Sequence, residues 1–296
     1  MNEDRAAKRL AHIAARDARI AARRQRTGGV QPAAPAADPA PAEAPTTAAP
    51  AATDAMPLPP PALVGRVAGS DNLTWFDQSG ALTVGDWKRA LRAIDRQFED
   101  FPRILDFGCG CGRVLRHLRG ALRPDQELIG VDVDAEAIGW VNANLPGVSA
   151  HVQGQLPPSP IADEAIDLIV NQSVFTHLPE DVGRAWLADL RRMLKPGGIA
   201  VLSFHGRSVW REFREAMRTE GSPEADLLHA DSGFHRNGFF YRAGRNPFEG
   251  ALPEYYGTAI HTIDYVDTEW QRYLELLAWL PRGSLQHQDI VVLRKN

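Results

Sequence analysis

The sequence predicts an α/β protein built on a doubly wound, mostly parallel β-sheet. From about residue 103 to residue 204, short apolar runs alternate with amphipathic stretches, which is typical of parallel strands joined by helices. The first run leads into three alternating glycines, Gly108, Gly110 and Gly112, and Asp132 ends the second run. Because ligands bind at the carboxyl ends of parallel strands, these features predict a binding site at that edge of the sheet.

The chain begins with two segments that we expect to lie outside the folded domain. Residues 1–26 hold eight Arg and Lys residues against three acidic ones, and their composition predicts a basic, Ala/Arg-rich helical arm. Such an arm either docks on a partner, a nucleic acid or an anionic membrane surface, or is a solvated helix without a ligand. Residues 27–62 contain ten prolines among many alanines, which predicts a disordered linker.

Composition limits the class of protein and its partners. Residues 1–26 carry +5 and residues 27–62 carry −3, so the total of −4 leaves −6 for residues 63–296. This charge attracts phosphate backbones only weakly, which argues against a nucleic-acid substrate. There is no apolar run long enough to predict a membrane span. Two cysteines, Cys109 and Cys111, cannot form a disulfide framework, so we expect a cytoplasmic protein in which they fill a tight turn rather than bind a metal.

Local patterns predict the elements of the folded domain, which is expected to begin at residue 63. An amphipathic helix over 87–98 is indicated by the three- and four-residue spacing of Trp87, Leu91, Ile94 and Phe98. The apolar runs predict strands at 103–107, 127–131, 148–152, 166–171 and 199–204. The stretches around them predict helices at 112–121, 134–144 and 180–193.

The pattern changes after the fifth strand. A helix at 207–219 is followed by a segment at 233–256 that is rich in aromatic residues and glycine. The remaining chain predicts a strand at 259–265, a helix at 267–277 and a strand at 289–294. Residues 206–262 are therefore interpreted as an insertion after strand five that caps the substrate at the carboxyl edge of the sheet. The alternative is an ordinary hydrophobic mini-core, and both interpretations can hold together.

The glycine turn indicates which cofactor to expect. The dinucleotide pattern G-x-G-x-x-G fails because Arg113 stands where its third glycine belongs, and the Gly-Lys-Ser/Thr of a P-loop is absent. The residues instead resemble class I S-adenosylmethionine-dependent methyltransferases, whose first motif is an acid, any residue and G-x-G-x-G. The resemblance continues through Asp132, residues 166–178 and the Leu-Lys-Pro-Gly-Gly at 194–198. It implies S-adenosylmethionine as cofactor and a Rossmann-like methyltransferase fold of seven strands, whose antiparallel last strand is 289–294.

The resemblance also implies how the cofactor is held. Its methionine carboxylate would lie at the helix start after Gly112 and its ammonium near Asp106. Asp132 would accept hydrogen bonds from the ribose hydroxyls, and Asn171 would lie near the reacting methyl group. Val133 would lie against the adenine, with Gln153 closing over its edge. The full predicted set is Asp106, Gly108, Cys109, Gly110, Gly112, Asp132, Val133, Gln153 and Asn171.

Histidines near strand ends are the candidates for a general base. His205 follows strand five directly, so it is the first choice, and His261 beside the cap is the second. The alternative for His205 is a structural role in its loop. His177 lies in a Phe-Thr-His-Leu turn that many members of the family share, so a structural role is expected for it. No cluster has the spacing of metal ligands, so no metal is expected.

Two segments of the sequence bear on the acceptor of the methyl group. The turn Asn171–Val174 differs from the Asn/Asp-Pro-Pro-Tyr/Phe motif, which argues against methylation of DNA adenine or glutamine amides. Residues 255–293 resemble bacterial methyltransferases that accompany glycosyltransferases. The sequence therefore predicts methyl transfer to an oxygen or nitrogen of a polar small molecule or glycan. The alternatives are a methyltransferase acting on RNA or protein, for which the basic arm would deliver the enzyme, and a non-catalytic scaffold.

Overall fold

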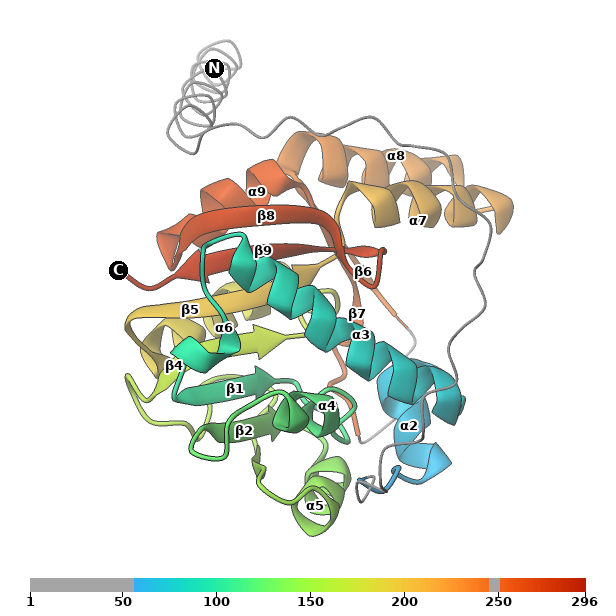
Figure 1. Cartoon of the computed structure of the whole chain (residues 1–296). Helices are drawn as coiled ribbons and strands as arrows, with labels where there is room; N and C mark the ends of the chain where they lie inside the picture. Colours follow the sequence, from blue (N-terminus) through green and yellow to red (C-terminus); the bar gives the residue numbers. More distant parts are fainter. Residues whose placement is uncertain (1–55, 245–250) are drawn as a thin grey trace, which may run out of the picture. The chain divides into compact units, whose positions relative to one another are not determined.

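The computed structural model describes residues 56–244 and 251–296 (Figure 1). The predicted arm at 1–26 and most of the predicted linker at 27–62 lie outside the described residues. The end of that linker belongs to the folded domain, so the boundary expected at residue 63 is a few residues late. The Arg116 guanidinium donates to the carbonyls of Met56 and, at 2.9 Å, of Pro57. The first described helix, α2, already begins at Pro61.

The described residues form a seven-stranded sheet in the order β3-β2-β1-β4-β5-β9-β8. Strands β1 to β5 run parallel, whereas β9 is antiparallel to both β5 and β8. The doubly wound, mostly parallel sheet is therefore confirmed. Its strands are β1 Arg103–Phe107, β2 Glu127–Asp132, β3 Ser149–Val152, β4 Ile166–Asn171, β5 Leu194–Phe204, β8 Glu275–Ser284 and β9 Gln288–Arg294.

Helices cover both faces of this sheet (Figure 1). One apolar cluster joins helices α3, α4 and α5 to one face, and another joins α6 and α9 to the other face. Both clusters form because the strands are apolar on their two sides, as expected for a parallel sheet between two helical layers. The helices are α3 Leu73–Arg92, α4 Leu115–Gly120, α5 Ala135–Asn144, α6 Glu180–Met193 and α9 Ile263–Glu269, with short turns at η1 Phe98–Asp100 and η3 Trp270–Arg272.

Three predicted elements differ from the structure. Of the helix predicted at 87–98, only residues 87–92 are helical, as the end of α3, which begins at Leu73 after the N-cap Asn72. Residues 93–97 are not helical, and Phe98 begins the short turn η1. The helix predicted at 267–277 is helical over 267–272, in the end of α9 and in η3, but its residues 275–277 begin the edge strand β8. The strand predicted at 259–265 divides between β7 and α9. Residues 275–277 are in a strand because the backbone of β8 pairs with that of β9 over most of their length.

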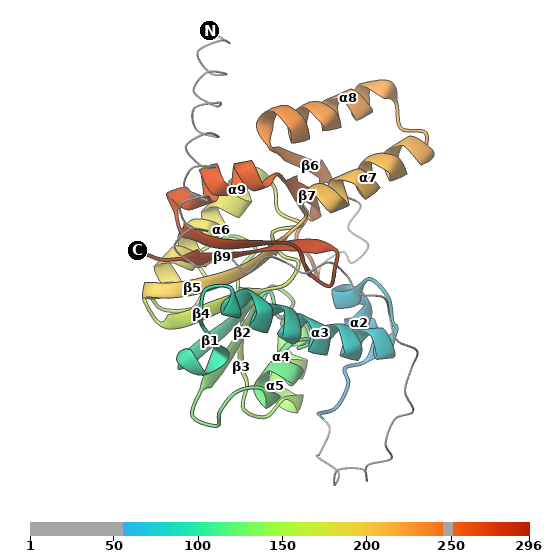
Figure 2. The same cartoon turned by 45° about the horizontal axis from the view of Figure 1, so that its top comes forward.

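The segment between β5 and α9 forms a small unit with its own core (Figure 2). Helix α7 Arg207–Thr219, helix α8 Glu224–Ser232 and the turn η2 Gly233–Asn237 pack with the antiparallel pair β6 Phe239–Ala243 and β7 Gly257–His261. Trp210 stacks on Phe234 in this core, with ring centroids 4.5 Å apart. The mini-core interpretation of residues 206–262 thus describes most of this segment. Among the described residues, no helix is long and apolar enough to span a membrane.

Candidate active site

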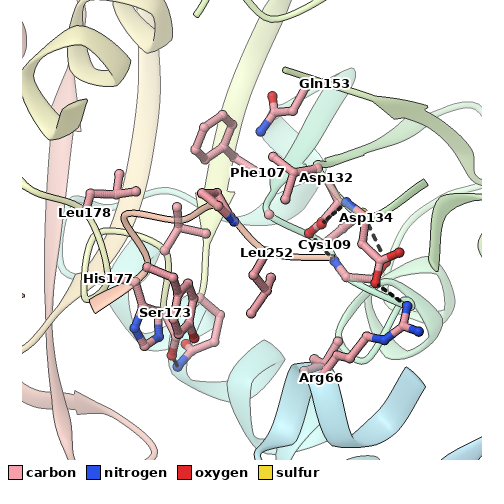
Figure 3. A pocket seen from close by; sticks show the side chains of 18 of the residues that line it. Arg66, Phe107, Cys109, Asp132, Asp134, Gln153, Ser173, His177, Leu178 and Leu252 are labelled. Atoms are coloured by element: carbon pink, nitrogen blue, oxygen red, sulfur yellow. Dashed lines mark hydrogen bonds and ion pairs between the residues drawn. The ribbon is translucent and has the colours of Figure 1, made fainter. Parts of the chain in front are cut away.

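A cavity of about 160 Å³ opens at the carboxyl ends of β1, β2 and β4, and the turn after β1 forms part of its wall (Figure 3). The three glycines of this turn have φ angles of +80°, +54° and +82°, in the left-handed region that favours glycine. The N–H groups of Gly108 and Cys109 donate to the Val131 carbonyl at 2.8 and 3.1 Å, which joins the turn to β2. A Cβ atom at Gly108 would lie 2.2 Å from Cγ2 of Val174, so the turn requires glycine there.

The structure brings most of the predicted cofactor residues to this cavity. Its lining includes Asp106, Gly108, Cys109, Gly110, Asp132, Val133 and Gln153. Gly112 and Asn171 do not line it. The Asn171 Nδ2 donates to the Phe107 carbonyl at 2.7 Å and ties β4 to β1, while Gly112 packs against Leu145. These two residues therefore support the wall from behind, in contrast to their predicted contact with the cofactor.

Asp106 presents an unpaired carboxylate oxygen to the cavity. Its side chain is 2% exposed, and Oδ2 has no hydrogen-bond partner among the described residues. Burial raises the pKa of Asp106 to about 7, against the lowering effect of Arg113 and with a further raising effect from Asp132. A cationic group in the cavity would satisfy this oxygen and favour its charged form.

Arg113 supplies the positive charge that was expected from a helix N-terminus. The helix α4 begins only at Leu115 and has six residues, so the prediction of a helix start directly after Gly112 is wrong. Arg113 instead lines the cavity, and its Nε has no partner among the described residues. Burial lowers its pKa and Asp106 raises it, and a guanidinium remains protonated under such a shift. Asp106 and Arg113 together offer complementary charges to an amino-acid zwitterion.

Asp132 is held at the end of β2 by the backbone around it. Its Oδ2 accepts a hydrogen bond from the Gly110 N–H at 2.7 Å, and its Oδ1 accepts one from the Asp134 N–H at 2.9 Å. Burial raises the pKa of Asp132, and these two hydrogen bonds oppose the rise. Each carboxylate oxygen has further lone-pair capacity, so the side chain can still accept hydrogen bonds from a pair of hydroxyl groups.

The helix α2 contributes a wall that the sequence analysis did not foresee. Arg66 on α2 lines the cavity, and its Nη1 pairs with Asp134 Oδ2 at 2.9 Å (Figure 3). Asp134 is also the N-cap of α5, where its Oδ1 accepts from the N–H groups of Glu136 and Ala137. Val67 of the same helix packs on Gly110 so closely that a Cβ there would lie 2.5 Å from it. The helix α2 therefore closes the side of the cavity next to Asp132.

Gln153 follows β3 and lies beside Asp132. Its backbone N–H donates to the Asp132 carbonyl at 2.9 Å, and its side chain is buried at the cavity. The side-chain oxygen Oε1 has no partner among the described residues. A buried amide oxygen without a partner is costly, so this atom suits a ligand that donates a hydrogen bond, such as an amino group.

The opposite side of the cavity carries a second group of polar residues, Ser173, His177 and Tyr256, which we call the histidine wall. Figure 3 shows Ser173 and His177 across the cavity from Asp132. The His177 ring stacks on Tyr256, with centroids 4.1 Å apart and planes at 19°. Its Nδ1 lies 2.8 Å from the Gly257 carbonyl, which can only accept, so Nδ1 carries the proton and Nε2 keeps its lone pair. Burial lowers the pKa of His177, which keeps the ring neutral.

The two histidines predicted as bases do not line this cavity. His205 lies behind His177, with ring centroids 6.3 Å apart, and its Nδ1 contacts the Ala259 carbonyl at 3.2 Å. His261 is 4% exposed among aromatic rings that include Phe239 and Trp270. Burial, with a smaller effect of neighbouring histidines, lowers the pKa of both rings to about 3. The prediction did not foresee β7, whose Ala259 N–H donates to the Thr176 carbonyl and whose His261 N–H donates to the His205 carbonyl, both at 2.8 Å.

Only the end of the predicted cap reaches the cavity among the described residues. Leu252, Pro253, Tyr255 and Tyr256 line it, whereas α7 and α8 do not. The Tyr255 hydroxyl donates to the Gln155 carbonyl beyond β3, and the Tyr241 hydroxyl donates to the Tyr255 carbonyl. The segment 252–256 is therefore tied across the cavity from the histidine wall to the residues after β3.

Sequence reasoning missed Arg66, Arg113 and Ser173 as lining residues. Arg113 could have been found, because it follows the glycine turn directly and a single cation there is unusual for a buried turn. Tyr256 of the aromatic segment was a candidate for positioning a hydroxyl group, and it does line the cavity. Arg66 and Ser173 had no local signal, because the contacts that bring them to the cavity join residues far apart in the chain.

Comparisons with known proteins agree with this geometry. A family model described as a methyltransferase domain matches residues 104–198. The malonyl-[acyl-carrier protein] O-methyltransferase of Methylococcus capsulatus is 31% identical over 118 residues, which cover 39% of this chain and 42% of that protein. A probable S-adenosylmethionine-dependent methyltransferase of Mycolicibacterium smegmatis is 29% identical over 112 residues, covering 38% of this chain and 41% of that protein. The chain thus spans about two fifths of the length of these relatives.

A solved structure with a similar fold is the 1,6-didemethyltoxoflavin-N1-methyltransferase of Burkholderia thailandensis, determined with 1,6-didemethyltoxoflavin and S-adenosylhomocysteine bound. It is 14% identical, the match covers 81% of this chain and 92% of that one, and the TM-score is 0.48. The family match covers β1 to the start of β5, which is the region that builds the glycine turn and the Asp132 site. Residues 104–198 are therefore a methyltransferase domain whose cofactor is S-adenosylmethionine.

Proposed function

We propose that this protein transfers a methyl group from S-adenosylmethionine to an oxygen or nitrogen atom of a polar small molecule or glycan. The observation that carries this proposal is the division of one cavity into two chemically different sides. Asp106, Arg113 and Asp132 line the cavity, and Figure 3 shows Ser173 and His177 of the histidine wall across the cavity from Asp132.

The first side fits the cofactor. Asp106 and Arg113 match the ammonium and carboxylate of its methionine, because each has an unpaired buried polar atom. Asp132 would accept hydrogen bonds from the two ribose hydroxyls, and the free Oε1 of Gln153 would accept one from the adenine amino group. Val133 lines the cavity next to Asp132, where it would lie against the adenine ring.

The histidine wall supports the chemistry of the acceptor. The cofactor supplies a methyl group on a sulfonium sulfur, which leaves as a neutral thioether. Alignment of the acceptor atom and removal of its proton are therefore the tasks left to the protein. We propose His177 as the general base, in place of His205 and His261, because its Nε2 keeps a lone pair while Nδ1 is fixed by Gly257. Nε2 takes the acceptor's proton as the acceptor atom bonds to the methyl carbon.

The proposal is tested in two steps with the full chain. Isothermal titration with S-adenosylmethionine should release heat, and S-adenosylhomocysteine should compete for the same site. Incubation with methyl-labelled cofactor and fractionated extract of the source cells should then label a compound of low molecular mass. Absence of binding would favour the scaffold alternative, whereas label found only in RNA or protein would favour the macromolecular one.

Cofactor binding is expected to release a proton near neutral pH. The pKa of Asp106 is raised to about 7 in the free protein, so about half of these carboxyls are protonated at pH 7. An ammonium placed beside Asp106 lowers that pKa, so binding expels the proton and affinity rises with pH up to about 7. Titrating S-adenosylhomocysteine in buffers of different ionisation enthalpy measures the release. Asp106→Asn should abolish it, and a heat that is independent of buffer in the unaltered protein would contradict the assignment.

A further inference from the structure

Ser173 occupies an unusual position in the histidine wall. Its φ angle is +63°, in the left-handed region that a residue with a side chain rarely adopts. A buried residue helps to maintain this backbone conformation, because the Ser173 N–H donates to Ser203 Oγ at 2.8 Å and Ser203 is fully buried. Backbone strain that surrounding contacts enforce is concentrated at functional sites. The side chain of Ser173 is therefore the place to look for a function.

Both lone pairs of the Ser173 hydroxyl are already engaged. Gln288 Nε2 donates to Ser173 Oγ at 2.7 Å, and Gln172 Nε2 donates to it at 3.1 Å. A hydroxyl has two lone pairs and one proton, so only the proton remains free to make a hydrogen bond. Because Ser173 lines the cavity, that proton can be donated to a ligand there.

The other contacts of the two glutamines match this orientation. Ser284 Oγ donates to Gln172 Oε1 at 2.7 Å, with the Gln172 amide nitrogen on the side of Ser173. The same nitrogen lies 3.5 Å from Gln288 Oε1, which in turn directs the Gln288 nitrogen to Ser173. Gln172 and Gln288 are 7% and 8% exposed, and Ser284 is fully buried. The donor character of Ser173 is thus built into a buried network from β4, β8 and β9.

Two residues of the histidine wall, Ser173 and His177, therefore offer one hydrogen-bond donor and one acceptor beside each other in the cavity lining. Ser173 provides the donor, and His177 Nε2 provides the acceptor. The charged residues of the cavity lining belong to β1 and the residues that follow it, to the residues around the end of β2 and to α2; they are Arg66, Asp106, Arg113, Asp132 and Asp134. The wall itself, Ser173, His177 and Tyr256, holds no carboxylate and no guanidinium or ammonium.

From this pairing we infer that the methyl acceptor is a neutral hydroxyl group, bound between Ser173 and His177. A hydroxyl accepts from Ser173 through a lone pair and donates its proton to His177 Nε2. An aliphatic ammonium has no lone pair for the Ser173 proton, and a carboxylate has no proton for His177. In the reaction, the acceptor oxygen bonds to the methyl carbon, the carbon–sulfur bond electrons go to sulfur and the hydroxyl proton goes to Nε2. The product is a methyl ether, and this inference rests on the function proposed above.

The chemical class of the product tests the inference separately from the proposed function. The labelled product is treated with mild alkali, which releases volatile methanol from a methyl ester, and is passed over a cation-exchange resin at acidic pH, which retains a methylated amine. A methyl ether is expected to do neither. A volatile or retained label would overturn the hydroxyl assignment while leaving methyl transfer intact. Failure to form any labelled product would instead count against the proposed function.

A variant at Ser173 tests the donor directly. Ser173→Gly removes the hydroxyl but suits a φ of +63°, so the fold should be kept. We expect kcat/KM for the labelled acceptor to fall by about 10-fold or more, as for a lost hydrogen bond that leaves a buried polar group unpaired, with unchanged cofactor affinity. Gln286→Gly is the matched control, because Gln286 has a φ of +54° in the exposed turn between β8 and β9. Equal values of kcat/KM for the two variants would show that Ser173 does not bind the acceptor.

Discussion

Replacing His177 by Asn is expected to lower kcat by between about 10² and 10⁴-fold, the range for loss of a general base. The Asn side chain can place an N–H where Nδ1 of the histidine lies, so the hydrogen bond to the Gly257 carbonyl is kept. What it lacks is the lone pair of Nε2. Cofactor affinity should not change, because Asp106, Arg113 and Asp132 are untouched. Single-turnover kinetics with labelled cofactor measures this effect.

The pH dependence of kcat provides an independent test of the role of His177. Burial lowers the pKa of His177 below its usual 6.5, so its basic form persists to lower pH than that of a solvent-exposed histidine. The kcat of the unaltered protein should therefore be level above pH 6.5 and fall only in more acidic solution. The His177→Asn variant should lose this acidic limb. The control is His235→Asn, at an exposed histidine in η2, which should leave both rate and profile unchanged. A kcat of the His177→Asn variant equal to that of the unaltered protein would show that His177 is not the general base.

Asp132→Ala is expected to weaken S-adenosylmethionine binding by about 1.5–3 kcal/mol, or roughly 10- to 150-fold in Kd. The change removes the proposed acceptor of the ribose hydroxyls. It also releases the N–H groups of Gly110 and Asp134, so the glycine turn loses one of its hydrogen bonds to the end of β2. Calorimetric titration measures the loss. Asp125→Ala is the matched control, because Asp125 is an exposed acid before the opposite end of the same strand. Equal Kd values for the two variants would mean that the ribose is held elsewhere.

The central part of the fold could be predicted because its signals are local. Strands β1, β2 and β4 are short apolar runs, and the glycines between β1 and α4 are needed for a turn that cannot accommodate a Cβ. The helices α6 and α7 follow from amphipathic spacing and were predicted with their observed bounds. The strands and the glycine turn also hold most of the residues proposed to bind the cofactor, so that part of the cavity lining could be predicted with them.

The rest depended on contacts between distant parts of the chain. The first half of α3 contains Gly80, which weakens a helical pattern, yet a Cβ there would lie 2.1 Å from the Arg113 carbonyl. Strand β8 has a sequence that is compatible with a helix and becomes a strand because it pairs with β9. The proposed role of His177 as the base could not be predicted for the same reason, because its ring is oriented by the carbonyl of Gly257, eighty residues further along the chain.

The central claim is that one cavity holds the cofactor on the Asp132 side and presents its methyl group to the histidine wall. A crystal structure of the protein with S-adenosylhomocysteine tests this most directly. We predict the ribose hydroxyls on the Asp132 carboxylate, the amino group on Asp106 and the sulfur directed towards His177. A nucleoside bound outside this cavity, or a sulfur that faces away from His177, would contradict the account.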